Sequence, residues 1–207
     1  MEPPEIEAHA AHKPTGRRWL DMAVSLAALV TSIASITMAF HNGQSMDRLV
    51  TANSWPFPIL ENSNFIAGES RIELAVRNSG SGPAKLETVT MFYQGKAMAN
   101  WRDLMRACCL APGAEASDDL IQNQTGYMLS DTPTGSVLLP GEQVLLMSLA
   151  RSDANLAAWD ALNAVRFELT FEACYCSVFD DCWTTNLQTT RPKPVAQCPA
   201  RDDVFRG

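Results

Sequence analysis

An unbroken apolar run from Trp19 to Phe40 is the longest hydrophobic pattern in the chain. As an α-helix its 22 residues would extend about 33 Å, and the hydrocarbon core of a bilayer is about 30 Å thick. The one charged residue in the run, Asp21, falls in the first helical turn, where lipid headgroups and the helix N-terminus both tolerate a carboxylate. The pattern therefore predicts a single transmembrane helix over residues 19–40.

Two other kinds of export signal, a cleavable signal peptide and a twin-arginine signal, are alternatives to this interpretation. Residues 37–39 offer a small-residue cleavage pattern, but the apolar region of a cleavable signal peptide usually has only about 7–15 residues. Arg17 and Arg18 could open a twin-arginine signal, yet the acidic Asp21 stands where an apolar residue is expected. An uncleaved signal anchor explains the run best.

Basic residues near the two ends of the run predict its orientation. Lys13, Arg17 and Arg18 precede the run, and the first basic residue after it is Arg48. Because Lys and Arg concentrate on the cytoplasmic side of a span, we expect a cytoplasmic N-terminus and an exported C-terminal part. Residues 1–18 contain prolines and few apolar side chains to bury, so they are predicted to form a disordered cytoplasmic tail.

Small side chains recur at every fourth position within the run, which places them in one stripe along a helix. Such a stripe lets a second helix approach closely, with hydroxyl groups available to bond across the contact. The alternative is that these common small residues face lipid like the rest of the span. The predicted helix-pairing stripe consists of Ala23, Ala27, Thr31, Ser35 and Ala39.

The pattern changes at residues 55–58, Trp-Pro-Phe-Pro, because proline removes a backbone donor and restricts the residue before it. Residues 41–56 are therefore predicted to be a juxtamembrane helix or linker. The remaining residues 57–207 are numerous enough for one exported domain with its own core.

Apolar and polar positions alternate over much of that domain, which is the period of a strand with one wet face. Strands are predicted over residues 71–77, 85–93, 137–139, 144–149 and 166–175, the last returning as a hairpin through 183–187. Glycine and proline clusters at 78–83 and 140–142 supply turns, and residues 94–96, Gln-Gly-Lys, end the second strand. The side chains of the fifth strand that are expected to face the core are Phe167, Leu169, Phe171 and Tyr175.

Two short helices are predicted among the strands. Residues 100–108 have apolar spacings of three and four, and a second helix is expected to begin at a Ser152 or Asp153 cap and to run through Asn163. Residues 111–135 are polar and contain glycine, so they are predicted to be a long excursion. The fold class that follows is mainly β: a β-sandwich with one or two short helices.

Two short segments resemble a known kind of module. Residues 72–84, Ile-Glu-Leu-Ala-Val-Arg-Asn-Ser-Gly-Ser-Gly-Pro-Ala, resemble the strand and turn of bacterial immunoglobulin-like, adhesion-type modules, and residues 139–142, Leu-Pro-Gly-Glu, resemble a later strand entry. As a whole the chain resembles bacterial single-pass inner-membrane proteins with an exported domain of this kind. The resemblance implies an immunoglobulin-like sandwich in the periplasm and carries over no functional residue.

All six cysteines follow the apolar run, and an even number in an exported domain favours disulfides. Cys176 and Cys182 bracket five residues, so a hairpin would set them opposite one another. Cys108 and Cys109 are adjacent at a predicted helix end, where side chains diverge by about 100°, which favours two different partners. The partners expected for that pair are Cys174 and Cys198.

The same cysteines allow a metal or redox site. Cys174, Cys176 and Cys182 could join one further cysteine in a tetrahedral thiolate site of the kind zinc prefers, although the paired Cys-x-x-Cys spacing is missing. Thiol redox chemistry would need positive charge near the thiolate, whereas this hairpin is acidic. Calcium binding by the acidic pairs 118–119 and 180–181 would need a ligand loop that the sequence lacks. Disulfides are therefore predicted, with no metal and no cofactor.

Charge and histidine content bound the function. From residue 41 onward 13 Lys and Arg stand against 19 Asp and Glu, which disfavours nucleic acid as a partner. The one histidine in that region, His41, lies beside the predicted membrane, so a Ser-His-Asp or Cys-His arrangement lacks its base. The sequence predicts a non-enzymatic, membrane-anchored binding or assembly module, whose partner would be another membrane or envelope protein. The alternative is an envelope thiol-redox or metal-handling protein.

Overall fold

The computed structural model describes residues 18–110 and 125–207, and the chain divides into two compact units between Val50 and Thr51. The predicted disordered tail lies outside the described residues, except for Arg18.

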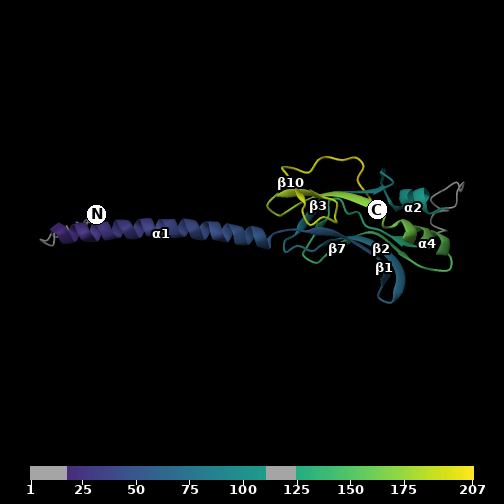
Figure 1. Ribbon diagram of the computed structural model, residues 1–207, viewed down its shortest axis with the longest axis horizontal. Coiled ribbons are helices and arrows are strands. Elements are labelled where there is room, and N and C mark those ends of the chain that lie inside the picture. The colour runs from purple at the N-terminus through teal and green to yellow at the C-terminus, as the bar shows by residue number, and fades with distance from the viewer. Residues whose placement is uncertain (1–17, 111–124) are drawn as a thin grey trace, which may run out of the picture. The chain divides into compact units, whose positions relative to one another are not determined.

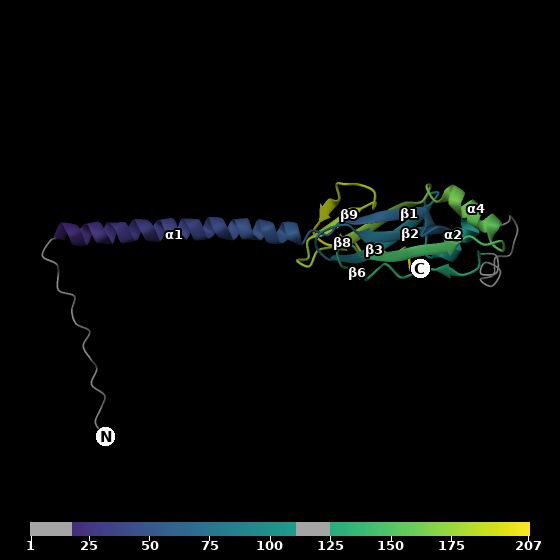
Figure 2. The same ribbon diagram turned by 90° about the horizontal axis from the view of Figure 1, so that it is seen from below.

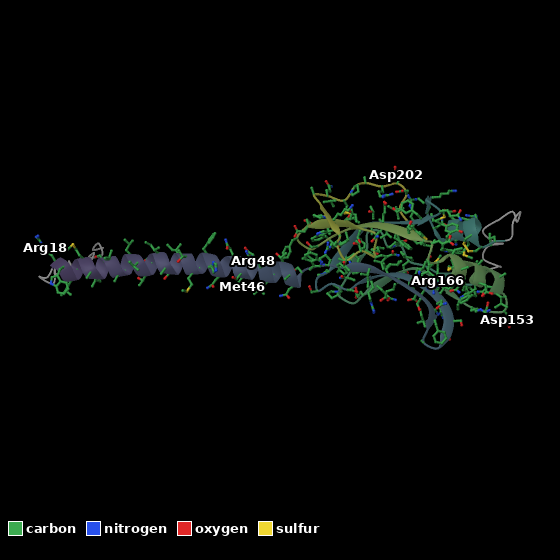
Figure 3. All side chains as sticks on the ribbon, in the orientation of Figure 1. Arg18, Met46, Arg48, Asp153, Arg166 and Asp202 are labelled. Carbon is green, nitrogen blue, oxygen red and sulfur yellow. A yellow bond between two sulfur atoms is a disulfide. The ribbon has the colours of Figure 1, made fainter. Side chains whose placement is uncertain are left out.

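The first unit is dominated by one helix, α1, from Arg18 to Asn53 (Figure 1). It is longer than the predicted span because residues 41–53 continue the same helix without a break. None of its residues is buried, and side chains project from all sides of it (Figure 3). By length and composition α1 is able to cross a membrane.

The second unit consists of two antiparallel sheets, which form two layers (Figure 1) and overlap when the unit is seen from below (Figure 2). The first sheet has the strand order β1-β2-β7-β5 and the second β10-β9-β8-β3-β4, with β6 also paired to β3. In the first sheet the strands are β1 Pro58–Ile66, β2 Glu69–Asn78, β7 Gln143–Ala150 and β5 Met128–Leu129. In the second they are β3 Ala84–Tyr93, β4 Lys96–Met98, β6 Val137–Leu138, β8 Thr170–Cys176, β9 Cys182–Thr185 and β10 Lys193–Val195.

One hydrophobic core lies between the sheets and extends under the two helices α2 (Trp101–Cys108) and α4 (Leu156–Val165). Alternation along β2 is confirmed, because Ile72, Leu74 and Val76 are all fully buried. Burial of each such side chain contributes about 1.5–3 kcal/mol. The prediction of a mainly β unit after a long apolar helix is therefore confirmed.

Four strands were not predicted: β1, β4, β10 and β5, which lies within the predicted excursion at 111–135. β1 has no clean alternation, and a register shift between Ser63 and Phe65 breaks its pairing with β2. Residues 94–96 were expected only to end a strand, but Gln94 and Gly95, with φ of 48° and 77°, form a two-residue turn into β4.

The second predicted helix begins later than expected. Asn155, not Ser152 or Asp153, precedes the first residue of α4. The Asn155 side chain accepts a hydrogen bond from the N–H of Ser152 and donates to the carbonyls of Thr125 and Ala150, at 2.8, 2.9 and 2.9 Å. These bonds fix the approach to α4 as a turn, so helix cannot start there.

Phe167 was wrongly predicted to face the core. It is 73% exposed and lies under the guanidinium of Arg166, 4.0 Å from its ring centroid. Strand β8 begins only at Thr170, so strand alternation does not reach Phe167. The other predicted inward residues of this segment are buried: Leu169, Phe171 and Tyr175.

Where the chain enters the second unit, the fully buried side chain of Asn78 makes four hydrogen bonds, which together we call the clasp. The Asn78 side chain accepts hydrogen bonds from the N–H groups of Phe57 and Gly80 at 3.1 and 3.0 Å. It donates to the carbonyls of Gly82 and Leu138 at 2.8 and 3.0 Å. A Cβ on Gly80 or Gly82 would meet backbone atoms of residues 54–57 at 2.3 or 2.2 Å, which explains the two glycines.

Candidate functional site

Residues after β9 first add the edge strand β10 to the second sheet and then return across its outer face to Cys198 (Figure 1). We call residues 189–201 the strap. Its Cys198 is joined to Cys174 of β8 by a disulfide. Cys174 lies on the face of β8 that alternation predicted to be polar and wet, yet only 1% of it is exposed because the strap covers it.

A cavity of about 470 Å³ lies between the strap and the sheet. This volume falls within the range of about 300–1,000 Å³ that small-molecule sites occupy. The sheet contributes hydroxyl groups and the half-cystine Cys174, and the strap contributes cationic side chains. The lining residues that matter for its chemistry are Thr88, Thr184, Asn186, Thr189, Arg191 and Lys193.

The carboxylate in the cavity wall is already paired with a cation. Glu172 forms an ion pair with Arg201, which also makes two hydrogen bonds to Asp203 at 2.8 and 2.7 Å. These hydrogen bonds raise the pKa of Arg201 and lower the pKa of Asp203 from its ordinary value. In contrast, Arg191 and Lys193 form no ion pair with any residue that the structure describes.

The loop between β9 and the strap holds its polar groups in place. The side-chain oxygen of Asn186 accepts hydrogen bonds from the N–H groups of Gln188 and Thr189 at 3.0 and 2.7 Å. The hydroxyl of Thr189 accepts one from the N–H of Arg191 at 3.1 Å. Within the described residues the Asn186 amide nitrogen has no acceptor, so this fixed side chain retains its donors.

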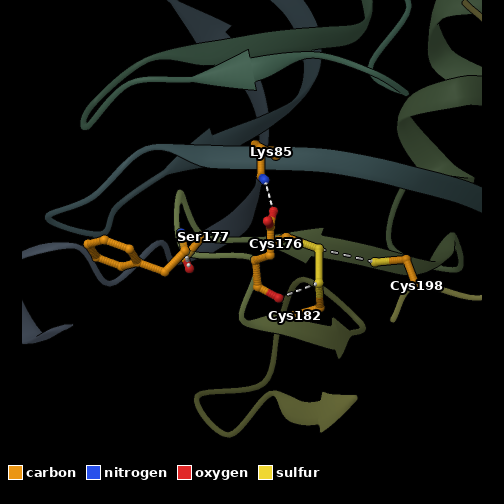
Figure 4. A network of polar contacts seen from close by, with 7 residues as sticks. Lys85, Cys176, Ser177, Cys182 and Cys198 are labelled. Atoms are coloured by element: carbon orange, nitrogen blue, oxygen red, sulfur yellow. Dashed lines mark hydrogen bonds and ion pairs between the residues drawn. A yellow bond between two sulfur atoms is a disulfide. The ribbon is translucent and has the colours of Figure 1, made fainter. Parts of the chain in front are cut away.

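Cys176 and Cys182, nominated from the hairpin spacing, are joined by a disulfide across the β8–β9 turn (Figure 4). The Sγ atom of Cys198 lies 3.8 Å from that of Cys176, so the Cys174–Cys198 disulfide is in contact with the Cys176–Cys182 disulfide. Lys85 of β3 forms an ion pair with Asp180 of the turn. The carboxylate that was considered as a calcium ligand is therefore engaged, and residues 118–119 lie outside the described residues.

The expected pairing of Cys108 and Cys109 with Cys174 and Cys198 is wrong, because Cys108 and Cys109 are joined to each other. Cys108 is the last residue of α2, and Cys109 leaves the helix with φ −130° and ψ 1°. Helical spacing therefore does not separate the two side chains.

Metal binding by the cysteine cluster is limited by these bonds. Three sulfurs, from Cys176, Cys182 and Cys198, lie within 4.8 Å of one another. Each of them is bonded to another sulfur, whereas the thiolate is the form that binds metal. The set could hold an ion only after reduction.

Exposed apolar side chains gather at the end of the second unit where the chain enters. Leu139 follows β6, and Val178 and Phe179 occupy the β8–β9 turn, which Lys85 ties to β3. Trp55 stacks on Trp183 with ring centroids 5.6 Å apart. We call this set the apolar end: Trp55, Val137, Leu139, Val178 and Phe179.

The predicted helix-pairing stripe lies on α1, and all of its members are exposed. Its hydroxyls bond within the helix: Thr31 donates to the carbonyls of Ala27 and Ala28 at 3.0 Å, and Ser35 donates to that of Thr31 at 2.8 Å. If a second helix packs on this stripe, the contact would depend mainly on the close approach of the two backbones and less on hydrogen bonds between the helices. Helix pairing stays a prediction.

Sequence reasoning found the cysteines but missed the cavity and the apolar end. The signal that was present is the cluster of threonines and cations over residues 184–193, which has no strand or helix period. Comparison with protein-family models, with curated protein sequences and with solved structures gave no match.

Proposed function

We propose that this chain is a single-pass inner-membrane protein whose α1 spans the bilayer and whose second unit, on the periplasmic side, is a non-enzymatic binding or assembly module. The apolar length of α1 and the excess of basic residues before it support this topology. The joining of all six cysteines in disulfides supports an oxidising compartment.

We infer an immunoglobulin-like sandwich for this module from its strand order. In that fold one sheet has the order A-B-E-D and the other has C-F-G. The first sheet, β1-β2-β7-β5, follows A-B-E-D when lettered along the chain, and β3-β8-β9 follows C-F-G. The chain departs from antibody domains in its disulfide, which links β8 to the strap and not to β2.

The observation that carries the binding role is the apolar end. Phe179 is 55% exposed and Val178 49%, on a turn whose flanking cysteines are bonded to each other. Large apolar side chains grouped on an otherwise polar surface mark contact sites for proteins. Because the turn is held by the Cys176–Cys182 disulfide, it offers a preorganised surface to a partner.

The test is photocrosslinking in membranes, with a photoreactive phenylalanine in place of Phe179. We expect one discrete crosslinked protein from the membrane or envelope, and loss of its copurification in mild detergent when Val178 and Phe179 are both replaced by serine. The matched control is Phe65→Ser with Phe167→Ser, which removes two exposed phenylalanines away from the apolar end. Equal loss in both variants, or no crosslink, contradicts the proposal.

A second candidate, an envelope thiol-redox or metal-handling protein, is favoured by one observation. The Sγ atoms of Cys198 and Cys176 lie 3.8 Å apart, so a thiolate formed by reduction of one bond would lie within reach of the other bond and could attack it, forming a new disulfide and releasing the second thiolate. This candidate predicts free thiols or bound zinc in protein isolated without reductant, which thiol labelling and metal analysis measure directly.

A further inference from the structure

We propose that the cavity under the strap binds a small hydroxylated anion, a sugar that carries a carboxylate or a phosphate. This goes beyond the proposed function and does not depend on it, because the cavity and the apolar end share no residue.

The charge of the cavity selects an anion. The chain from residue 41 onward has six more acidic than basic residues, yet the strap brings Arg191 and Lys193 to the cavity wall without an ion pair among the described residues. The lining has three cations, Arg191, Lys193 and Arg201, against one carboxylate, Glu172, although Arg201 is shared between Glu172 and Asp203. The exposed side chains of Arg191 and Lys193 therefore give the wall an excess of positive charge within a negative unit.

The other lining residues favour a ligand that also carries hydroxyl groups. Thr88 and Thr184 lie on the outer face of the sheet, and Lys193 of β10 is paired in register with Thr184. Asn186 has its oxygen occupied by the loop and keeps two N–H donors. Hydroxyl groups and amide donors on one wall can hydrogen-bond the hydroxyl groups of a small sugar.

The strap is held to the sheet at two places. Lys193 lies in β10, which is paired with β9, and Cys198 is bonded to Cys174 in the cavity wall. Binding sites gain affinity when their groups are held in place before the ligand arrives. Affinity is therefore expected to depend on the Cys174–Cys198 bond as well as on the two cations.

The experiment is isothermal titration calorimetry on the full chain in a detergent without sugar or phosphate groups. The probes are glucuronate, glucose 6-phosphate, glucose and inorganic phosphate. We expect one site for glucuronate or glucose 6-phosphate, with glucose and phosphate each at least about tenfold weaker, equivalent to about 1.4 kcal/mol. Which of the two anions binds distinguishes a sugar carboxylate from a sugar phosphate.

Two variants separate the site from general charge. Arg191→Gln with Lys193→Gln should weaken binding about tenfold or more, and the wild-type affinity should fall as salt is added. Lys96→Gln with Arg206→Gln removes the same charge from exposed positions outside the cavity and should bind as the wild type does. Melting temperatures of all variants report whether each remains folded.

The inference is overturned if no probe binds at millimolar concentration, or if glucose binds as tightly as the anionic sugars. It is also overturned if inorganic phosphate binds with the same affinity as glucose 6-phosphate, because the sugar ring and its hydroxyl groups then contribute nothing to binding. Unchanged binding in the variant with Arg191→Gln and Lys193→Gln would show that these two cations do not bind the anion.

Discussion

The outer faces of the two sheets differ in how they meet solvent. The first sheet is open, and its outward side chains pair along the surface: Arg77 with Glu61 at 3.1 Å, and Gln143 with Glu73 at 3.2 Å. On the second sheet the strap adds the edge strand β10 and then crosses the outer face, where Cys174 is buried and an open cavity forms. A similar alternation of apolar and polar residues therefore gives a solvent-exposed face on the first sheet and a candidate binding site on the second. The difference between the two faces is the strap, which the Cys174–Cys198 disulfide joins to β8.

The largest effect is expected at the residue that ties the two sheets together. Asn78 ends β2, and its side chain bonds the carbonyl of Leu138 in β6 and the turn that leads to β3. Asn78→Ala leaves buried N–H and carbonyl groups without partners, at roughly 1–3 kcal/mol for each, so a loss of about 3 kcal/mol or more in unfolding free energy is expected. Urea denaturation of the full chain, followed by near-ultraviolet circular dichroism, measures it.

Asn78→Asp sharpens this prediction. The aspartate keeps the two acceptor contacts to Phe57 and Gly80 but loses the donors to Gly82 and Leu138. An alanine variant as stable as the wild type would show that the clasp does not hold the sheets together.

The second effect concerns the covered face directly. Cys174→Ser with Cys198→Ser opens a link across 24 residues, and loop-closure entropy places its contribution at about 3 kcal/mol. We expect a corresponding fall in unfolding free energy and faster proteolysis within the strap, measured by urea denaturation and limited trypsin digestion.

The vicinal pair provides the control for that experiment. Cys108→Ser with Cys109→Ser removes a disulfide that closes almost no loop, so the expected loss is about 1 kcal/mol or less. If both double variants lose equal stability, the strap has no special role in covering the second sheet.

A smaller, pH-dependent effect is expected at the end of the strap. Hydrogen bonds from Arg201 lower the pKa of Asp203, so its contribution to stability is complete above the ordinary carboxyl pKa of about 4 and is lost as the pH falls through the lowered value. Because the side chain is 41% exposed, the expected contribution is below about 1 kcal/mol. Asp203→Asn should lower the melting temperature at pH 7 and leave it nearly unchanged at pH 2; the reverse order would contradict the assignment.

The smallest effect is expected on the open face. Arg77 and Glu61 form an exposed pair, so Arg77→Gln should change the unfolding free energy by about 0.5 kcal/mol or less. Thermal melts at low and high salt measure it. A loss comparable to that of the strap disulfide would mean that the two faces do not differ as described.

Local patterns predicted the first sheet better than the second. Alternation in residues 71–77 identified the core side chains of β2, since Ile72, Leu74 and Val76 are buried while Arg71, Glu73 and Arg77 stay partly exposed. Alternation also placed Cys174 on the outer side of β8, yet it could not show that the position is buried. That burial depends on the Cys174–Cys198 bond across 24 residues, which no local period encodes.

The candidate site was largely beyond sequence reasoning for the same reason. Arg191 and Lys193 lie in a segment without strand or helix period, and the pairing of β10 with β9 places them beside the sheet that holds Thr88. The hairpin spacing of Cys176 and Cys182 was sufficient for that bond, since both partners are local. Cys108 and Cys109 were paired wrongly because the backbone leaves the helix between them.

The most direct test of the account is the state of the cysteines in membranes. Membrane-fraction protein is denatured and treated with a maleimide polymer, with and without prior reduction, and its gel shift counts the reactive thiols. An exported module closed by three disulfides predicts no shift before reduction and six added polymers after it. Reactive thiols before reduction would contradict the exported, disulfide-closed module and favour the thiol-redox or metal-handling alternative.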